Sequence, residues 1–229
     1  MRRESPADVG VHIARLRLRK TQGRVTQEAL LEAGTEAIHQ AQLLNDAGLD
    51  AVAFNCTGAS LSDGPAGARR LLKDIAEATG TKATTTIIAV VNALRASGLR
   101  RIVHICPFTA EFSTDEANFL RSEGFEIVAS RGLNFTDARV AAKLTPQEIF
   151  DIASQFDQKE ADGLFLACAN VRAMEATAAL QQALGKPVIT SNQAILWELL
   201  RLISHPAADN LLTATAHGAS QNSATIGET

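Results

Sequence analysis

Residues 163–192 have the sequence GLFLACANVRAMEATAALQQALGKPVITSN, in which three kinds of segment follow one another. A short apolar run ends at Cys168, a segment with apolar residues at helical spacing ends at Gly185, and a second short apolar run follows Pro187. Short apolar runs bounded by turn residues predict buried strands, and the periodic segment between them predicts a helix. This order of elements is the βαβ unit of a parallel sheet.

The first half of the chain contains a similar unit. The apolar run AVAFNC (51–56) ends at a cysteine like GLFLAC (163–168), ARRLLKDIAEATG (68–80) has the length, periodicity and closing glycine of AMEATAALQQALG (173–185), and KATTT (82–86) corresponds to KPVITSN (186–192). The two cysteines are separated by close to half of the chain. Duplication of one unit and chance similarity between two βαβ units both explain this pattern.

Strand-like and helix-like segments alternate along the rest of the chain. The predicted strands are 9–18, 51–55, 101–106, 125–129, 163–167 and 187–190. The predicted helices are 26–48, 66–79, one that starts at Ser113 with Glu116 as its capping-box partner, one that starts at Thr145, 173–184 and 192–203. The segment 84–96 is predicted to begin as the edge of a strand and to turn helical before Gly98. Residues 218–229 are small and polar and are predicted to be frayed. The alternation predicts an α/β protein with parallel sheets, whose ligands bind at the carboxyl ends of the strands.

The composition excludes several classes of function. A formal net charge of −3 gives no general attraction to nucleic acid or to an anionic membrane. No apolar run approaches the roughly 20 residues that span a bilayer, and no apolar segment follows the basic N-terminal residues as in a signal peptide. Three cysteines without a Cys-x-x-Cys pair predict free thiols and a cytoplasmic location. Neither phosphate-binding glycine motif is present, so no nucleotide cofactor is expected.

Cys56 and Cys168 are the candidate catalytic residues, because each follows a predicted buried strand and precedes small or polar residues. Such a loop can direct backbone N–H groups toward an anion or a thiolate. The alternative for each is a buried structural cysteine, because free cysteine packs like a small hydrophobic residue. Cys106, which ends the strand 101–106, is expected to pack in the core. No histidine shares a motif with a cysteine, so a Cys–His dyad is not favoured, and no spacing indicates a metal site.

Five segments carry a resemblance to a known family. They are FNCTGASL (54–61), CPFTAEF (106–112), RGLNFTDARVAAKLTPQEI (131–149), LFLACANVRAMEA (164–176) and KPVITSNQAILWELLRL (186–202). Together they resemble the maleate cis-trans isomerases and arylmalonate decarboxylases of the aspartate/glutamate racemase superfamily, over nearly the whole chain. The resemblance implies two pseudo-symmetric Rossmann-like lobes with parallel sheets and an active site in the cleft between them. We expect a first lobe of residues 1–97, joined by a C-terminal helix at 192–215, and a second lobe of residues 98–191.

The resemblance also implies an activity, namely cofactor-independent isomerisation of a small dicarboxylate such as maleate. Cys56 corresponds to the first-lobe cysteine, the expected nucleophile, and Cys168 to the second-lobe cysteine, which transfers a proton. The expected substrate contacts are Thr57, Gly58, Ala59, Phe108, Thr109, Asn134, Ala169 and Asn170. A small carboxylate is the expected partner, no metal or organic cofactor is expected, and a dimer or tetramer of the chain is an open expectation.

Two features depart from the family pattern. A tyrosine of the family corresponds here to the turn Pro107-Phe108, and the chain contains no tyrosine, so Thr109 is expected to supply the hydroxyl group. Family members open with a strand and a Ser/Asn-rich loop, whereas MRRESPADVGVHIARL (1–16) resembles the segment after that loop, so we expect the first strand to be absent. The alternative functions are an amino-acid or hydantoin racemase, an arylmalonate decarboxylase-like enzyme, and a non-catalytic protein that binds a small acid.

Overall fold

Two parallel sheets organise the chain in the computed structural model, which describes residues 4–19, 25–156 and 158–212. The smaller sheet pairs β1 (Ala51–Phe54) with β2 (Lys82–Thr85). The larger sheet has the strand order β4-β3-β5-β6, formed by Glu126–Gly132, Arg101–Cys106, Gly163–Leu166 and Val188–Thr190. Every strand pair is parallel, which confirms the α/β fold with parallel sheets.

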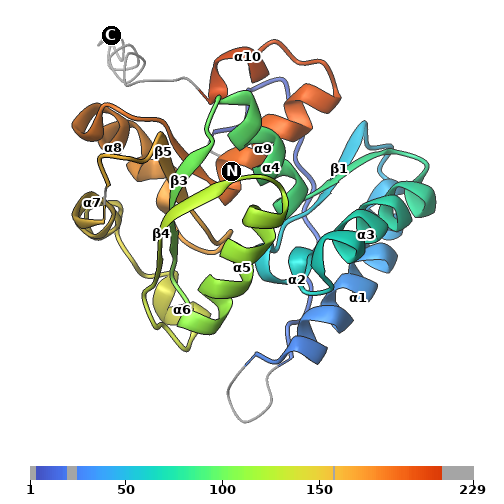
Figure 1. Ribbon diagram of the computed structural model, residues 1–229. Coiled ribbons are helices and arrows are strands. Elements are labelled where there is room, and N and C mark those ends of the chain that lie inside the picture. The colour runs from blue at the N-terminus through green and yellow to red at the C-terminus, as the bar shows by residue number, and fades with distance from the viewer. Residues whose placement is uncertain (1–3, 20–24, 157, 213–229) are drawn as a thin grey trace, which may run out of the picture.

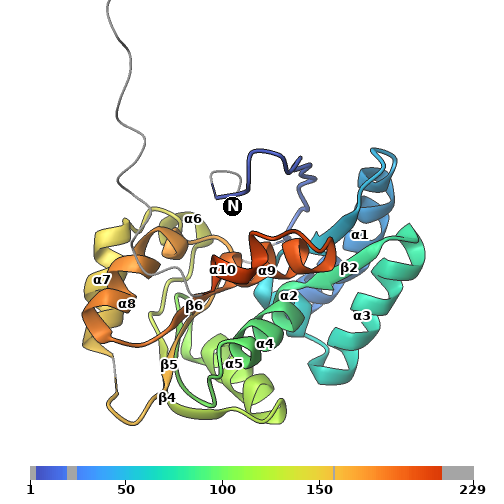
Figure 2. The ribbon, with the colours of Figure 1, turned by 90° about the horizontal axis from the view of Figure 1, so that it is seen from above.

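Helices connect the strands and surround both sheets. They are α1 Gln27–Asn45, α2 Thr57–Leu61, α3 Gly64–Thr79, α4 Thr86–Ala96, α5 Ala110–Ser122, α6 Ala138–Ala141, α7 Pro146–Gln155, the 3₁₀ helix η1 Ala173–Ala176, α8 Thr177–Leu184, α9 Ser191–Leu202 and α10 Ala208–Leu211. Figures 1 and 2 show α1 and α3 beside the smaller sheet, α7 and α8 beside the larger sheet, and α4, α5 and α9 between the two. None of the helices described is long and apolar enough to cross a lipid bilayer.

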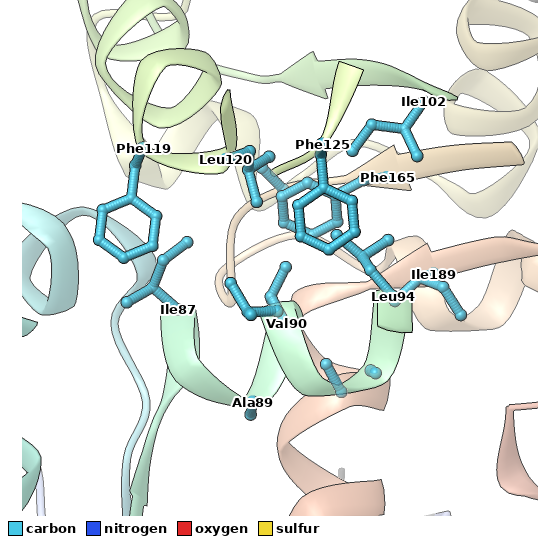
Figure 3. Close-up of a cluster of buried hydrophobic side chains, with 14 of the residues drawn as sticks. Ile87, Ala89, Val90, Leu94, Ile102, Phe119, Leu120, Phe125, Phe165 and Ile189 are labelled. Atoms are coloured by element: carbon cyan, nitrogen blue, oxygen red, sulfur yellow. The ribbon is translucent and has the colours of Figure 1, made fainter. Parts of the chain in front are cut away.

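The largest hydrophobic cluster lies where the two lobes meet (Figure 3). Ile87, Val90 and Leu94 of α4 pack with Phe165 of β5 and Ile189 of β6, and all five side chains are fully buried. Because α4 directly follows β2 of the smaller sheet, its apolar face joins that sheet to the larger one. The two lobes therefore share one core, and a lobe boundary at residue 97 stays a prediction.

Helix α7 begins as the sequence predicts. The Thr145 hydroxyl accepts the backbone N–H of Glu148 at 3.2 Å, and the Glu148 carboxylate accepts the backbone N–H of Thr145 at 2.8 Å. Pro146 occupies the first turn, where its missing N–H leaves no hydrogen bond unmade. This complete capping box confirms the predicted start of the helix.

Replacing Thr145 by alanine is expected to lower the free energy of unfolding by about 1 kcal/mol, because the N-cap hydrogen bond is lost. Thr145→Ser retains a hydroxyl in the same place and is expected to keep most of that stability. Urea denaturation of both variants measures the difference. Equal stability of the alanine and serine variants would contradict a role for the hydroxyl.

The prediction of a strand at residues 9–18 is wrong. The segment belongs to neither sheet and crosses the surface as irregular chain between α10 and α1 (Figure 2). Val9 packs against the α9–α10 cluster and Leu16 against the α1–β1 cluster, while Ile13 is 65% exposed. Alternation of apolar and polar residues forms a strand only where a neighbouring strand supplies hydrogen bonds, and the pattern itself does not reveal that partner.

The predicted helix start at Ser113 is also wrong. Helix α5 begins at Ala110, with Thr109 as its N-cap residue. Ser113 and Glu116 are buried inside the helix, where Ser113 contacts Ser130 at 2.9 Å and Glu116 contacts His104 at 2.9 Å. The two side chains thus match the capping-box spacing but make contacts with β3 and β4 instead.

The predicted C-terminal helix at 192–215 consists of two helices where the structure describes it. Helix α9 ends at Leu202, and Ser204 adopts a φ of 58° before α10 begins. Residues 213–215 and the predicted frayed end at 218–229 lie outside the described residues.

Candidate functional site

Cys56 and Cys168 lie close to each other although they belong to different lobes. Cys56 comes two residues after the end of β1, and Cys168 comes two residues after the end of β5. The charge of Cys56 contributes to raising the pKa of Cys168, so the two thiols lie within electrostatic range of one another. The carboxyl ends of the two sheets therefore bring both candidate cysteines to one region of the molecule.

Each of the two sulfur atoms faces two backbone N–H groups of the residues that follow it. The N–H groups of Gly58 and Ala59, two and three residues after Cys56, are directed at its sulfur. The N–H groups of Asn170 and Val171, two and three residues after Cys168, are directed at the second sulfur, and the Asn170 nitrogen is 3.3 Å away. Such donors favour a thiolate. The repeated strand–cysteine motif in the sequence thus corresponds to a repeated pair of N–H donors, although Cys56 has an extended backbone with a φ of −151° and Cys168 has a φ of 88°.

Burial opposes ionisation of both cysteines. Cys168 is 8% exposed, and burial, followed by the charges of Glu116 and Cys56, raises its pKa to about 12. Burial is also the main cause of the raised pKa of the half-buried Cys56, where the N–H groups of Ala59 and Gly58 act in the opposite direction. Cys168 therefore carries its proton at neutral pH, and Cys56 ionises only in part.

Cys106 differs from the other two. It is completely buried within the cluster between the lobes, as predicted, and burial raises the pKa of its thiol far above the usual range. All three cysteines are free thiols.

The backbone turns sharply at Cys168, which has a φ of 88°. Asn134 has a φ of 61°. A residue with a side chain rarely adopts a positive φ, and such positions concentrate at functional sites. At Cys168 this conformation accompanies the short contact between its sulfur and the Asn170 nitrogen.

Helix α9 begins between the two cysteine loops and joins them. The Asn192 side-chain amide donates to the carbonyl oxygen of Ala169 at 2.9 Å and accepts from the Asn55 amide at 3.1 Å. The hydroxyl oxygens of Thr57 and Ser191 are 3.1 Å apart. Sequence reasoning missed Asn55, Ser191 and Asn192, although the Thr-Ser-Asn that follows the apolar run at 187–189 is a polar signal at a strand end.

Replacing Asn192 by alanine is expected to lower the free energy of unfolding by about 1–2 kcal/mol, because the Ala169 carbonyl and the Asn55 amide each lose a partner. Asn118→Ala, on an exposed face of α5, is the matched control and is expected to change stability by less than about 0.5 kcal/mol. Chemical denaturation measures both. A loss no larger than that of the control would show that the hydrogen bonds of Asn192 contribute nothing to the free energy of unfolding.

The turn after β3 brings together three of the other predicted contact residues. The Asn134 N–H donates to the Phe108 carbonyl at 2.8 Å, and Thr109 is the N-cap residue of α5. The close approach requires a glycine at 132, where a Cβ would lie 2.9 Å from the Thr109 backbone. Phe108 also packs 6.1 Å from Phe112, measured between ring centroids. Phe108 and Thr109 are half-buried and Asn134 is exposed.

The remaining predicted contact residues differ in how far they are exposed to solvent. Thr57 and Ala59 are each 4% exposed, so their side chains face the protein interior. Gly58 and Ala169 are half-buried, and the exposed Asn170 uses its side-chain amide to donate to the Ala138 carbonyl at 2.7 Å.

Two small cavities lie near this region. An apolar cavity of about 30 Å³ is lined by residues that include Pro107, Leu133, Ala167 and Val171, so it adjoins the loop of Cys168. A polar cavity of about 150 Å³ lies between α5 and β4. Neither cavity is lined by a candidate cysteine, so a substrate-sized cleft between the lobes stays a prediction. Within the ranges that the structure describes, no group of His, Cys, Asp and Glu side chains could hold a metal ion.

A two-lobed parallel α/β fold with one cysteine after a strand in each lobe defines the class of this protein. The chain belongs to the arylmalonate decarboxylase family, whose family model matches residues 21–214. It is 28% identical to an arylmalonate decarboxylase of Bordetella bronchiseptica over 79% of this chain and 76% of the relative. It is 27% identical to a maleate isomerase of Pseudomonas putida over 84% of this chain and 78% of the relative.

Solved structures show the same fold. A crystal structure of arylmalonate decarboxylase matches with a TM-score of 0.71 and 26% identity, covering 81% of this chain and 83% of that one. A Nocardia farcinica maleate cis-trans isomerase that carries a covalently bound succinylcysteine intermediate matches with a TM-score of 0.77 and 21% identity, covering 83% of this chain and 82% of that one. The relatives are enzymes, and both kinds of activity occur among them.

Proposed function

We propose that this protein is a cofactor-independent isomerase that converts a small cis dicarboxylate such as maleate to its trans isomer, with Cys56 as nucleophile and Cys168 as proton donor. The observation that carries the proposal is the matched pair of cysteines, one from each lobe, within electrostatic range and each facing two backbone N–H groups. Decarboxylation by proton transfer alone requires only one such thiol. The succinylcysteine in a related isomerase is the adduct that a cysteine nucleophile would form.

The chemistry follows from the different surroundings of the two thiols. The Cys56 thiolate adds to one carbon of the double bond, and the electron pair moves onto the far carboxylate as an enediolate. The Cys168 thiol donates its proton to the neighbouring carbon, which leaves a single bond that can rotate. The Cys168 thiolate then takes a proton back, the C–S bond breaks, and the trans product leaves with Cys56 again a thiolate. Phe108, Thr109, Asn134, Ala169 and Asn170 are the proposed contacts of the substrate.

The rate is expected to rise with pH. Because burial raises the pKa of Cys56 above its ordinary value, the reactive thiolate is a minor form at neutral pH. Its fraction then increases about tenfold per pH unit, and kcat/KM should follow between about pH 6.5 and 8.5. Cys168, with a pKa of about 12, keeps its proton throughout this range, so no falling limb is expected from it. A flat profile in this range would show that Cys56 already ionises at a lower pH.

The test is conversion of maleate to fumarate by the purified protein in the presence of EDTA, followed by proton NMR. Fumarate formation without added cofactor supports the proposal. Absence of turnover on maleate, together with racemisation of an amino acid or loss of carbon dioxide from an arylmalonate, would replace it with another activity of the superfamily. Maleate that raises the melting temperature without turnover on any of these substrates would indicate a binding protein.

Decarboxylation of a substituted malonate is the second candidate, because one observation favours it. The family model that matches residues 21–214 is that of arylmalonate decarboxylase, and a relative with 28% identity is an arylmalonate decarboxylase. Competition separates the candidates, since phenylmalonate should bind more tightly than maleate if decarboxylation is the activity.

A further inference from the structure

The first two residues of α9 contact both chain neighbours of Cys56. The Asn55 side-chain amide donates to the side-chain oxygen of Asn192 at 3.1 Å. The hydroxyl oxygens of Thr57 and Ser191 are also 3.1 Å apart. Since Asn55 directly precedes Cys56 and Thr57 directly follows it, the backbone of this cysteine is held on both sides by one turn of one helix.

The same turn also contacts the loop of Cys168. The Asn192 side-chain amide donates at 2.9 Å to the carbonyl oxygen of Ala169, the residue directly after Cys168. Immediately before α9, Thr190 of β6 pairs with Leu166 of β5, two residues before Cys168. Two hydrogen bonds of one side chain thus connect the residue before the first cysteine with the residue after the second.

Helix α9 is itself anchored in the core. Ala194 and Ile195 are completely buried in the cluster between the lobes. The helix begins with a side-chain cap, in which the Thr190 hydroxyl accepts the Gln193 N–H at 3.1 Å. Reacting groups keep their geometry when a rigid element and supporting hydrogen bonds hold them. A displacement of about 1 Å can lower a rate about a hundredfold, so the contacts of α9 bear on any reaction that both thiols share.

We propose that Ser191 and Asn192 are positioning residues, which fix the separation and relative orientation of the Cys56 and Cys168 thiols. Loss of the Asn192 side chain leaves both thiols in the protein but allows the two loops to move relative to each other. A reaction that uses one thiol then proceeds as before, whereas a reaction that uses both becomes slow. The proposal rests on the joint action of the two thiols in the proposed function, but its first test needs no substrate.

The experiment uses dibromobimane, a reagent with two bromomethyl groups, in which each bromide is displaced by one thiol. After one cysteine has reacted, added glutathione competes with the other for the second group. The ratio of bridged to singly modified protein, measured by peptide mass spectrometry, therefore reports how the sulfur atoms of Cys56 and Cys168 are placed. Asn192→Ala is expected to lower this ratio about tenfold, while alkylation of Cys56 alone by iodoacetamide stays unchanged. Asn118→Ala, at an exposed position of α5, should change neither measurement.

The two measurements separate positioning from a general loosening of the structure. Loosening would change the alkylation of Cys56 together with the ratio, and this result would overturn the proposal. An unchanged ratio in Asn192→Ala, or a wild-type protein that yields no bridged product, would overturn it as well. If Asn192→Ala does not fold, as judged by circular dichroism, Asn55→Ala removes the same hydrogen bond at an exposed side chain and is judged by the same criteria.

Turnover provides a second readout. With maleate, Asn192→Ala should lower kcat about tenfold to a hundredfold and leave KM nearly unchanged, because binding of the substrate does not depend on the spacing of the thiols. A raised KM with an unchanged kcat would overturn the positioning role. If the wild-type protein does not isomerise maleate, the proposed function fails, and the ratio of bridged to singly modified protein still decides whether α9 positions the two thiols.

Discussion

Replacement of Cys56 by alanine is expected to lower kcat for maleate isomerisation at least about a thousandfold, because the bond to the substrate carbon can no longer form. The neighbouring hydroxyl groups cannot substitute for the thiol. Thr57 is buried with its hydroxyl against Ser191, and the Ser60 hydroxyl donates to the Thr57 carbonyl at 2.9 Å. Initial rates of fumarate formation measure the loss, in variants whose melting temperatures show that they are folded.

Trapping of an intermediate distinguishes a nucleophile from a structural thiol. If Cys56 attacks and Cys168 transfers the proton, Cys168→Ser should slow the release of the adduct. Intact mass spectrometry should then show a covalent species, heavier by the mass of maleic acid, with the modification at Cys56. The double variant Cys56→Ala and Cys168→Ser is the matched control and should show no adduct. Turnover by Cys56→Ala within about tenfold of the wild type would contradict the assignment.

Much of the fold could be predicted because local signals agreed with the tertiary arrangement. The predicted strand 101–106 coincides with β3, and the cap at Thr145 begins α7 as expected. The failures at residues 9–18 and at Ser113 have a common physical cause. Alternation and capping-box spacing are local patterns, whereas pairing with another strand and contact with Ser130 depend on segments far away in the sequence.

The two cysteines could be found from the sequence because a strand end places the following residue at the edge where ligands bind in parallel sheets. Their surroundings could not be found in the same way. Asn192 forms hydrogen bonds with Ala169, which is 23 residues away from it along the chain, and with Asn55, which is 137 residues away. The pairing of His104 with Glu116 depends on how α5 packs over β3, and the capping-box spacing of Glu116 from Ser113 pointed to a different contact. Local patterns thus locate candidate residues, and packing shifts the pKa values of their side chains.

Cys168 offers a prediction in which stability and activity change independently. Cys168→Ala and Cys168→Gly are both expected to lower turnover by about 10²- to 10⁴-fold, because each removes the proton donor. The two variants should differ in stability, since residue 168 has a φ of 88°. A Cβ at positive φ is strained and glycine is not, so the glycine variant is expected to be more stable than the alanine variant by about 1 kcal/mol. Urea denaturation together with initial rates measures both effects.

Comparing the two variants tests whether the backbone at residue 168 is strained and whether the thiol of Cys168 is needed for proton transfer. Glycine would relieve the strain at this position, but it would leave no thiol for proton transfer. A strained cysteine can persist there because the surrounding hydrogen bonds fix the loop, including those to Ala169 and to the sulfur itself. An alanine variant as stable as the glycine variant would show that the backbone is not strained at this residue. Retention of wild-type turnover by either variant would show that the proton comes from another group.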